Sequence, residues 1–573
     1  MAMKPIIVLV ALYFIVMHYV LRDCIKEDGK EKVMDMSFNA EISRRRFVEA
    51  MGAVSALGVM GLAGCGSQRA SEAGSSSSSA SGVADTITFA QGADPRGLDP
   101  AYVDDGESAK IICNIYDTLL RYETETCEVV AGLSEMPEIS DDGLTYTFKL
   151  QEGVKFHDGT DCDAEAVKAS IERQLEPNRT EDMPYAGFVF GAQDSGTGIE
   201  SIETPDATTL VIKLRAASTP FVKNMAMALA APIVAPSAFE AGTSLEQPVG
   251  SGPYKFVSWS KGENVVLEAN EDYWDKENAP KTKNVVFRFI AENSSRVTAL
   301  TNGEVDIIDG IDASVVDTIT GGGCELFDED GMNINYMAFR NDSGQFTAVE
   351  ARRAFCQAVN VEEMVKSLYG DYAGVATSVM PLWMAPYAEK VTRTEYDPDA
   401  AKAAFAELGI TSCTMLTYTN PRPYNTIGGQ ALAEAIQGYL AKVGVDMEIV
   451  SYDWTTYKTK VETDAFDVCL YGWVGDNGDP DNFMNLLSDE NVSMNVGRFR
   501  NDEYNALIKK GLETADGDER DDIYLQCEQM VADQMPWMLI SHSKNLAAYS
   551  PKVKGFFYHP TGVVHMEGVT KSA

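Results

Sequence analysis

The chain has 573 residues, which is longer than one hydrophobic core usually organises, and it is therefore predicted to form several structural units. Its 86 acidic and 47 basic side chains leave a net charge of −39, which argues against nucleic acid and anionic lipid headgroups as partners because both would be repelled. With 45% hydrophobic residues, the composition excludes a chain that is disordered throughout.

The first 64 residues have the pattern of an export region. Residues 43–47 read Ser-Arg-Arg-Arg-Phe, an apolar run follows over residues 51–63, and the run leads into Leu-Ala-Gly-Cys ending at Cys65. An arginine pair before a short apolar run is typical of a twin-arginine signal, here over about residues 36–64. The ending resembles a bacterial lipobox, which implies cleavage before Cys65 and lipid attachment to its sulfur. A short buried helix with an incidental cysteine is the alternative.

An earlier apolar run, residues 5–21, carries no charge and approaches the length of a membrane span. Two consecutive export segments are unusual, so we expect translation to begin near Met34 or Met36, which would leave residues 1–33 upstream of the true start. A genuine transmembrane helix is the alternative. Residues 65–84 are rich in Ser, Ala and Gly and predict a flexible tether between the lipid anchor and the folded body.

The folded body begins with a predicted strand at residues 86–90. Apolar residues at helical spacing then predict a helix over residues 108–120. A hairpin turn at residues 141–143 leads into an alternating strand over residues 144–150. Asp163 is placed to cap a helix that runs to about residue 175.

In the C-terminal half, helices alternate with strands. Asp397 begins a predicted helix over residues 397–408, and a second helix over residues 429–443 ends before Gly444. Strands are predicted at residues 446–451 and 466–470. Helix–strand alternation with short loops predicts a mostly parallel sheet whose strand ends face a crevice.

A loop rich in glycine and aspartate, residues 471–483, follows the last of these strands. It carries Asp476, Asp479 and Asp481 among three glycines, a composition that suits a cation or the ammonium group of a ligand. An acidic turn in solvent is the alternative. We expect Asp479 and the proline after it to shape the loop, and Asp481 to cap a helix that starts at Asn482.

Several long stretches resemble the family 5 extracellular solute-binding proteins of ABC importers. The likeness begins with LTYTFKLQEGVKFHDGTDCDAEAVKASIERQL at residues 144–175 and continues with VGSGPYKFVSWSKGENVVLEANEDYW at residues 249–274. It extends through NGEVDII at residues 302–308 to residues 552–555. The resemblance implies an α/β, two-lobed periplasmic-binding-protein-like fold of type II, in its three-domain peptide-binding subclass. It also implies a receptor without enzymatic activity or cofactor, which works with a permease and an ATPase.

The resemblance also implies a division of the chain. Domain I would comprise residues 85–118, 250–330 and 545–573, domain II residues 119–249, and domain III residues 331–544. The chain would cross between lobes near residues 331–336 and again near residues 538–542. Domains I and II would form one lobe and domain III the other.

Three stretches resemble the dipeptide-binding members of the family: residues 422–425, 472–483 and 539–543. By that resemblance, Asp476 would hold the ammonium group of a peptide and Arg422 its carboxylate. A guanidinium suits this task because its planar fork binds a carboxylate through two parallel hydrogen bonds. Further ligand-binding candidates are Tyr424, Trp473, Gly472, Tyr471, Asp104 and Gly106. Trp473 is equally consistent with core packing.

The sequence gives less support to other functions. The histidines after the tether, namely His157, His542, His559 and His565, form no cluster at ligand spacing, which disfavours a nickel or zinc site but leaves haem open. No Gly-x-Ser-x-Gly or His-Glu-x-x-His motif supports an exported peptidase or hydrolase. A tethered signalling module would use the same cleft. The ten cysteines include no Cys-x-x-Cys pair and assign no disulfide. We expect a monomer.

Overall fold

The computed structural model describes residues 84–191 and 196–572. The predicted twin-arginine signal, the lipidated Cys65 and the tether up to residue 83 lie outside these residues. Within the described ranges, no helix combines the length and apolarity that crossing a membrane requires.

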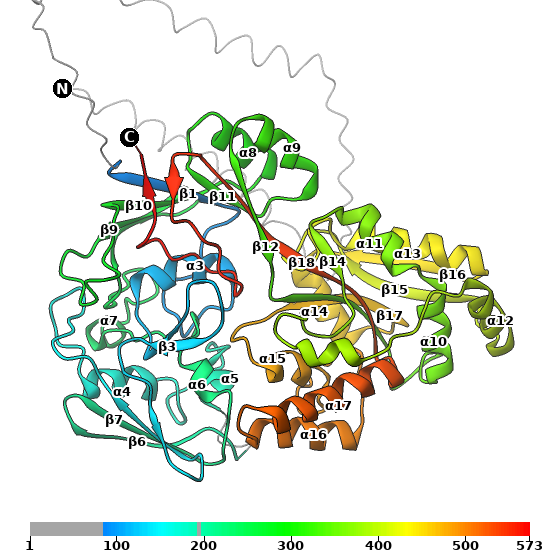
Figure 1. Ribbon diagram of the computed structural model, residues 1–573, viewed down its shortest axis with the longest axis horizontal. Helices are drawn as coiled ribbons and strands as arrows, with labels where there is room; N and C mark the ends of the chain where they lie inside the picture. Colours follow the sequence, from blue (N-terminus) through cyan, green and yellow to red (C-terminus); the bar gives the residue numbers. More distant parts are fainter. Residues whose placement is uncertain (1–83, 192–195, 573) are drawn as a thin grey trace, which may run out of the picture. The chain divides into compact units, whose positions relative to one another are not determined.

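A large mixed sheet runs through the described chain (Figure 1), in the order β16-β15-β17-β13-β18-β11-β1-β10-β9-β8, with β12 and β14 also paired to β18. The end of the sheet from β11 to β8 comes mainly from the N-terminal half: β1 (Thr86–Gln91), β8 (Tyr254–Ser260), β9 (Asn264–Ala269), β10 (Asn284–Phe289) and β11 (Ile307–Asp309). Strand β1 pairs in parallel with both β10 and β11, which confirms the strand predicted at residues 86–90.

The other end of the sheet comes from the C-terminal half: β13 (Asn333–Phe339), β15 (Ser412–Tyr418), β16 (Asp446–Tyr452) and β17 (Val468–Val474). Strand β15 lies parallel to both β16 and β17, but β13 is antiparallel to β17 and to β18 (Trp537–Tyr549). The prediction of a mostly parallel sheet was therefore wrong. Helices connect β15, β16 and β17 and keep these three strands parallel, whereas β13 lies between β17 and β18 and runs opposite to both.

Strand β18 links the two halves of the sheet. Its first part, up to Ser543, pairs with β13 and with β14 (Ala373–Val375), and its second part, Lys544–Tyr549, pairs with β12 (Glu325–Asp330) and β11. Only Gly331 and Met332 separate β12 from β13. We call the described residues of 84–330 and 545–572 lobe 1, and residues 331–544 lobe 2.

Lobe 1 also contains a four-stranded antiparallel sheet in the order β4-β5-β7-β6. Its strands are β4 (Glu138–Ile139), β5 (Thr145–Lys149), β6 (Ile199–Asp206) and β7 (Thr209–Leu214), and a separate pair joins β2 (Leu120–Tyr122) to β3 (Val129–Ala131). The predicted hairpin before β5 is confirmed. Helix α4 (Ala164–Glu172) begins as predicted, because the Asp163 side chain accepts a hydrogen bond from the backbone N–H of Ala166.

Helix α3 (Gly106–Ile115) is shorter than the helix predicted over residues 108–120. Asp105 caps its start, and the chain turns into extended backbone at Tyr116. Leu119 and Leu120 are buried in the core beneath the small sheet, whereas Ile111 and Ile112 are buried in the core of the large one. The apolar run was misinterpreted as one helix because it serves two separate cores.

The helices of lobe 2 begin and end where capping residues allow. Helix α12 (Pro398–Leu408) starts after Asp397, whose side chain accepts from the N–H of Ala400, and α13 (Gly429–Val443) stops at Gly444 in the left-handed region. Both predicted helices are confirmed. The remaining longer helices are α10 (Val349–Ala358), α11 (Val361–Tyr369), α14 (Trp454–Thr463), α16 (Asp502–Glu513) and α17 (Asp518–Gln534).

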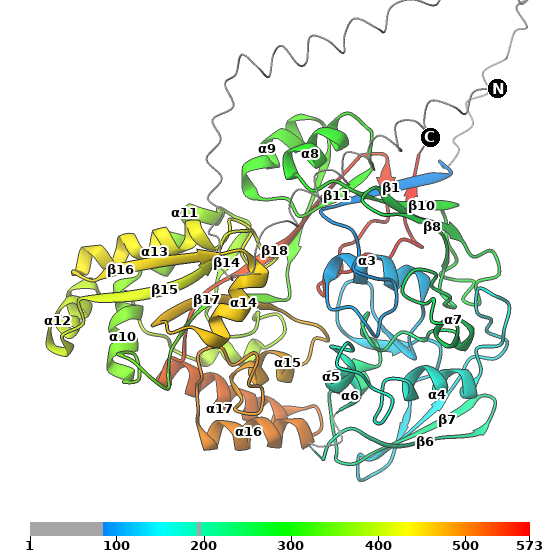
Figure 2. The same cartoon turned by 180° about the vertical axis from the view of Figure 1, so that it is seen from behind.

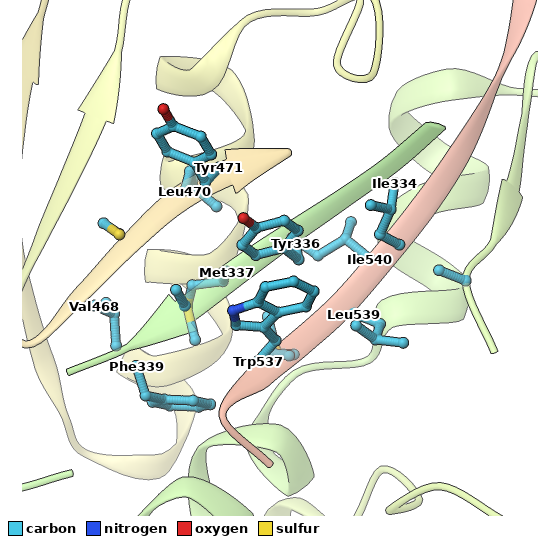
Figure 3. Close-up of a cluster of buried hydrophobic side chains, with 14 of the residues drawn as sticks. Ile334, Tyr336, Met337, Phe339, Val468, Leu470, Tyr471, Trp537, Leu539 and Ile540 are labelled. Atoms are coloured by element: carbon cyan, nitrogen blue, oxygen red, sulfur yellow. The ribbon is translucent and has the colours of Figure 1, made fainter. Parts of the chain in front are cut away.

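The core of lobe 2 lies around β13, all of whose residues are buried. Trp537 of β18 stacks on Tyr336 of β13 with the ring centroids 3.8 Å apart, as Figure 3 shows. Leu470 and Tyr471 of β17 belong to the same cluster. This packing fixes the strands from which the loops of the candidate site extend.

Candidate functional site

Three parallel strands of lobe 2 end at one edge of the sheet. Strand β15 ends at Tyr418, paired with the last residue of β16, Tyr452, and β17 continues past this level to Val474. The segments that follow carry Arg422, Trp454 and Asp476 in turn. Loops at the carboxyl ends of parallel strands are a frequent place for ligands. Figure 2 shows α14, which begins at Trp454, beside β17.

Arg422 lies in a tight turn that is held by hydrogen bonds to buried residues. The backbones of Arg422 and Asn425 exchange two hydrogen bonds, of 3.0 and 2.8 Å. The buried Asn425 side chain accepts a hydrogen bond from the Tyr369 hydroxyl at 2.7 Å and is joined to the Tyr418 hydroxyl at 3.0 Å. The turn is therefore held by the core and does not depend on a ligand.

The Arg422 guanidinium lies over the Trp454 ring, with 4.1 Å from its central carbon to the ring centroid. Arg422 forms no ion pair with any described residue, and its buried Nε has no hydrogen-bond partner there. A guanidinium stacked on an indole keeps its charge and its outer N–H groups free for an incoming anion. The arrangement suits a carboxylate.

Tyr424 joins the Arg422 turn to β17. Its ring lies so close to Gly472 that a Cβ added there would stand 2.2 Å from Cδ2 of Tyr424. Its carbonyl accepts a hydrogen bond from the Ser543 hydroxyl at 3.0 Å. Burial raises the pKa of Tyr424, and the nearby charge of Arg422 opposes that shift. Gly472 is needed because no side chain fits between the two segments.

Asp476 is a carboxylate without a cation. Its Oδ2 accepts from the Asn482 side chain at 3.0 Å, its Oδ1 accepts from the Tyr185 hydroxyl of lobe 1 at 3.1 Å, and no described residue forms an ion pair with it. Burial raises its pKa to about 6, although both hydrogen bonds favour the charged form. An ammonium group placed here would supply the missing charge.

Asp479, three residues on, is already neutralised. It is fully buried and accepts two hydrogen bonds from Arg520, at 2.7 and 2.8 Å, and one from Lys223 of lobe 1 at 3.0 Å. Burial alone would raise its pKa, but the hydrogen bonds of Arg520 and the charge of Lys223 outweigh burial and hold the pKa below its ordinary value. This acid is structural.

The predicted cap of the following helix was wrong. Helix α15 (Pro480–Met484) is capped by Asp479, which accepts from the N–H of Asp481, whereas Asp481 lies in the first turn. The helix begins two residues earlier than predicted because Pro480 occupies the first helical position, where its fixed φ favours a helix start. Burial, and then the charge of Asp479, raise the pKa of Asp481 to about 7.

The other predicted residues lie around these two charges. Tyr471, Gly472 and Trp473 belong to strand β17 and not to the loop predicted to start at residue 471. The Trp473 indole donates to Asn482 at 2.8 Å, and Tyr471 packs against Trp454 at 5.5 Å between ring centroids.

In lobe 1, Asp104 is exposed and pairs with Arg96, while Gly106 begins α3 with open space beside it. Burial, then the charge of Asp476 and last that of Asp104, raise the pKa of Tyr185.

A cavity of about 1360 Å³ is lined by Gly478 but by neither Asp476 nor Arg422. No group of three or more His, Cys, Asp or Glu side chains within residues 84–191 and 196–572 is placed to hold a metal ion. All eight cysteines from Cys113 onward are free thiols.

Comparison with known proteins places the chain in a family. The family described as bacterial extracellular solute-binding proteins, family 5 Middle, matches residues 128–495, well over half of the chain. This chain belongs to that family. It is therefore a solute-binding protein with the two-lobed periplasmic-binding-protein fold, as the resemblance of its motifs implied.

Individual relatives of this family 5 protein extend over most of its length. It is 30% identical to "Heme-binding protein A" of Haemophilus influenzae over 85% of this chain and 92% of that protein. It is 28% identical to "Dipeptide-binding protein" of Escherichia coli K12 over 85% of this chain and 95% of the relative. Among solved structures, an ABC transporter-associated periplasmic binding protein from Helicobacter pylori, in complex with the peptide STSA, superposes with a TM-score of 0.75 at 28% identity, covering 86% and 99% of the two chains.

Sequence reasoning on this family 5 protein missed three residues of the site. Trp454 had a usable signal, since it follows a predicted strand at the edge where Arg422 and Asp476 were placed. Asn482 lies in the quoted loop, but its hydrogen bonds to Asp476 and Trp473 depend on the start of α15. No signal in the sequence pointed to Tyr185, because 291 positions separate it from Asp476.

Proposed function

We propose that this family 5 solute-binding protein captures dipeptides or other short peptides by their free termini and delivers them to the permease and ATPase of an ABC importer. Asp476 holds the ammonium group and Arg422 the carboxylate. The observation that carries this proposal is a carboxylate and a guanidinium at one sheet edge, each held in place by neighbours and each without an opposite charge among the described residues.

The physics of the pair explains selectivity for length. The termini of a peptide are separated by at most ~3.6 Å per residue, so two fixed charges measure its span. A ligand that satisfies only one of them leaves the other unpaired in a site from which closure expels water, and such a charge is costly. Side chains vary freely where bridging waters adapt to them. The dipeptide-binding and peptide-bound relatives support this class of ligand.

Calorimetric titration with di- and tripeptides, and with their N-acetylated and C-amidated forms, tests the proposal. Free dipeptides are expected to bind, to raise the melting temperature and to be recovered intact, whereas an exported peptidase would cleave them. N-acetylation is expected to abolish binding, and C-amidation is expected to weaken it, because each removes one of the two ligand charges. Equal affinity for blocked and free peptides would remove the basis of the proposal.

Replacement of Arg422 gives a matched test at the level of the protein. Arg422→Ala is expected to weaken binding of a free dipeptide by about 2 to 5 kcal/mol, because a buried carboxylate loses its partner. The same variant is expected to bind the C-amidated peptide no worse than the wild type does. A similar loss for both peptides would show that Arg422 does not contact the carboxylate.

Haem is the second candidate ligand, because the 30% identical relative carries the name haem-binding protein. A haemin titration followed by absorbance, repeated with saturating dipeptide, separates the two ligands. Haemin binding that excludes dipeptide would favour haem at the shared site. Dipeptide binding without any haemin signal would exclude haem and support the short-peptide proposal.

The proposal includes a lipid anchor at Cys65 after a twin-arginine signal, so that the protein acts at the outer surface of the cell membrane. Cys65→Ser is expected to release the protein from the membrane fraction without changing peptide affinity. Mass spectrometry of the mature N-terminus checks both the cleavage site and the lipid. An unmodified Cys65 in membrane-bound protein would point to anchoring by residues 5–21 instead.

A further inference from the structure

A large cavity lies between the lobes and has no part in the proposed peptide site. Its volume is about 1360 Å³, above the ~300–1,000 Å³ typical of small-ligand pockets. Lobe 1 contributes residues of β3, β4, β12 and of α6 (Phe221–Asn224), and lobe 2 contributes Trp383, Met384 and the end of α16. Figure 1 shows β3 and α6 on one side of the view, α16 on the other, and β12 above them.

The lining is strongly acidic. It includes eight carboxylate side chains against one cation, Lys223, whereas the whole chain has 86 acids to 47 bases. The ratio in the cavity therefore exceeds what the acidic composition alone produces. Lys223 is bound to the buried Asp479 at 3.0 Å. Glu125, Asp141 and Glu329 form no ion pair with a described residue, and their negative potential is left for a guest.

Apolar side chains stand exposed beside these carboxylates. Met136, Ile139 and Trp383 are 48%, 50% and 42% exposed, and all three line the cavity together with Phe557 and Met384. Exposed apolar surface on a soluble protein that is rimmed by polar groups marks interaction sites. An indole and methionine thioethers next to carboxylates favour a guest with both a cationic and an aromatic part.

The cavity is separated from the proposed peptide site by the loop after β17. Gly478 of that loop lines the cavity and packs directly on Cys127 of lobe 1, where an added Cβ would stand 2.3 Å from the cysteine Cβ. Asp476 and Arg422 do not line the cavity. A guest there cannot be bound by the pair proposed to hold peptide termini.

We propose that this cavity is a second binding site, for short cationic peptides that carry an aromatic side chain and are recognised by internal charges and not by their ends. Lysine or arginine side chains pair with the carboxylates, and the aromatic ring packs between Trp383 and the apolar side chains of lobe 1. Because both lobes line the cavity, and because Thr219 of lobe 1 already bonds to the Thr514 carbonyl of lobe 2 at 2.7 Å, occupancy stabilises the contact between the lobes.

The test uses the blocked peptide acetyl-Lys-Trp-Lys-amide, which has no free terminus, in calorimetric titrations with the purified protein. It is expected to bind with an affinity that falls as salt rises. Trp383→Ala, and separately the pair Asp141→Asn with Glu329→Gln, are each expected to weaken binding at least tenfold. Arg422→Ala is expected to leave it unchanged while it weakens binding of free dipeptides.

Controls separate this site from non-specific attraction to an acidic surface. Leu408→Ala with Glu407→Gln removes an exposed apolar side chain and a carboxylate from the end of α12, outside the cavity, and is expected to have no effect. Acetyl-Glu-Trp-Glu-amide is expected not to bind.

The proposal is overturned if the lysine peptide does not bind, if the control pair weakens binding as much as the cavity variants do, or if the glutamate peptide binds equally well. Competition between the blocked peptide and a free dipeptide at one site would also overturn it. Free dipeptides report on the peptide-terminus proposal independently of all these outcomes.

Discussion

At the scale of single residues, identical side chains in one loop differ in what surrounds them. Asp479 is neutralised by Arg520 and Lys223, and its pKa is held low. Asp476 has only neutral hydrogen-bond donors, and burial raises its pKa to about 6. The first carboxylate stabilises the fold, whereas the second is available for a ligand charge.

Peptide affinity is expected to depend on pH through Asp476. Below its pKa of about 6 the carboxyl group becomes neutral and loses its attraction for ammonium, so affinity is expected to fall towards tenfold per pH unit between pH 6 and 5. The peptide's own termini, at about 3.5 and about 8, do not titrate in that range. Calorimetry from pH 5 to 7.5 measures the slope.

Asp476→Asn is the control for this slope, because Asp481, with a pKa of about 7, titrates nearby. The variant is expected to bind weakly and without the pH dependence of the wild type. A slope that survives in Asp476→Asn would assign the titration to another group.

The raised pKa of Asp476 also affects the stability of the protein without ligand. The contribution of this carboxyl group to the free energy of unfolding decreases as pH rises from about 4 to 6, because the folded state binds its proton more tightly than the unfolded state does.

Asp479→Asn is expected to destabilise the protein strongly. The substitution leaves the Arg520 guanidinium, 2% exposed, without its buried partner, at a cost of about 3–5 kcal/mol. Urea denaturation monitored by circular dichroism measures the loss. Asp516→Asn removes the exposed partner of the same arginine and is expected to cost less than about 1 kcal/mol. Equal losses would contradict a structural role for Asp479.

At the scale of elements, the site depends on how closely the Arg422 turn approaches β17. The turn lies against the strand through Tyr424 and Gly472, and the parallel pairing of β15 with β17 sets the level at which both segments leave the sheet. Trp454 at the start of α14 then covers the guanidinium from the neighbouring strand end. The three segments that make these contacts therefore follow, or belong to, three neighbouring parallel strands: β15, β16 and β17.

Gly472→Ala is expected to displace Tyr424, because the new Cβ would stand 2.2 Å from a ring carbon. Overpacking of this kind costs about 1–3 kcal/mol of stability, and the shifted turn is expected to weaken peptide binding as well. Thermal unfolding and calorimetry measure the two effects. Gly438→Ala, at an open position in α13, serves as the control: it is expected to leave affinity unchanged and to raise stability by up to about 1 kcal/mol through helix propensity. Wild-type affinity in Gly472→Ala would contradict the role of the close approach.

At the scale of the whole described chain, the loop after β17 joins the two lobes. Asp476 accepts from Tyr185, the Asn477 amide donates to Asn224 at 2.7 Å, and Asp479 binds Lys223. The segment proposed to hold the peptide ammonium is therefore also the segment that contacts lobe 1. Ligand binding and lobe closure share these residues. The division into domains I, II and III stays a prediction.

Asn224→Ala is expected to loosen the contact between the lobes, because it leaves the buried amide of Asn477 without its partner at a cost of about 1–3 kcal/mol. The variant is expected to release dipeptide faster and to show a larger radius of gyration in X-ray scattering with ligand present. Lys213→Met, which removes an ion pair within lobe 1, is the control. An unchanged release rate in Asn224→Ala would show that this bond does not hold the closed state.

The sequence by itself determined the elements and the content of the site. Asp163 and Asp397 as caps, Gly444 as a helix end and the acidic loop before residue 483 were predictable because capping, turn formation and amphipathic periodicity act between near neighbours in the chain. The same local rules failed at α3, where one apolar run serves two cores, and in the sheet, where the direction of β13 depends on the distant β18.

Only the tertiary structure decided which acid of the loop keeps its charge unpaired. Arg520 lies 41 positions from Asp479 and Lys223 lies 256 positions from it, while Tyr185 reaches Asp476 across 291 positions. A carboxylate's pKa and its availability to a ligand depend on burial and on the charges that surround it in space. Those charges come from segments that meet only when the two lobes fold and pack, so no local pattern in the loop distinguishes Asp476 from Asp479.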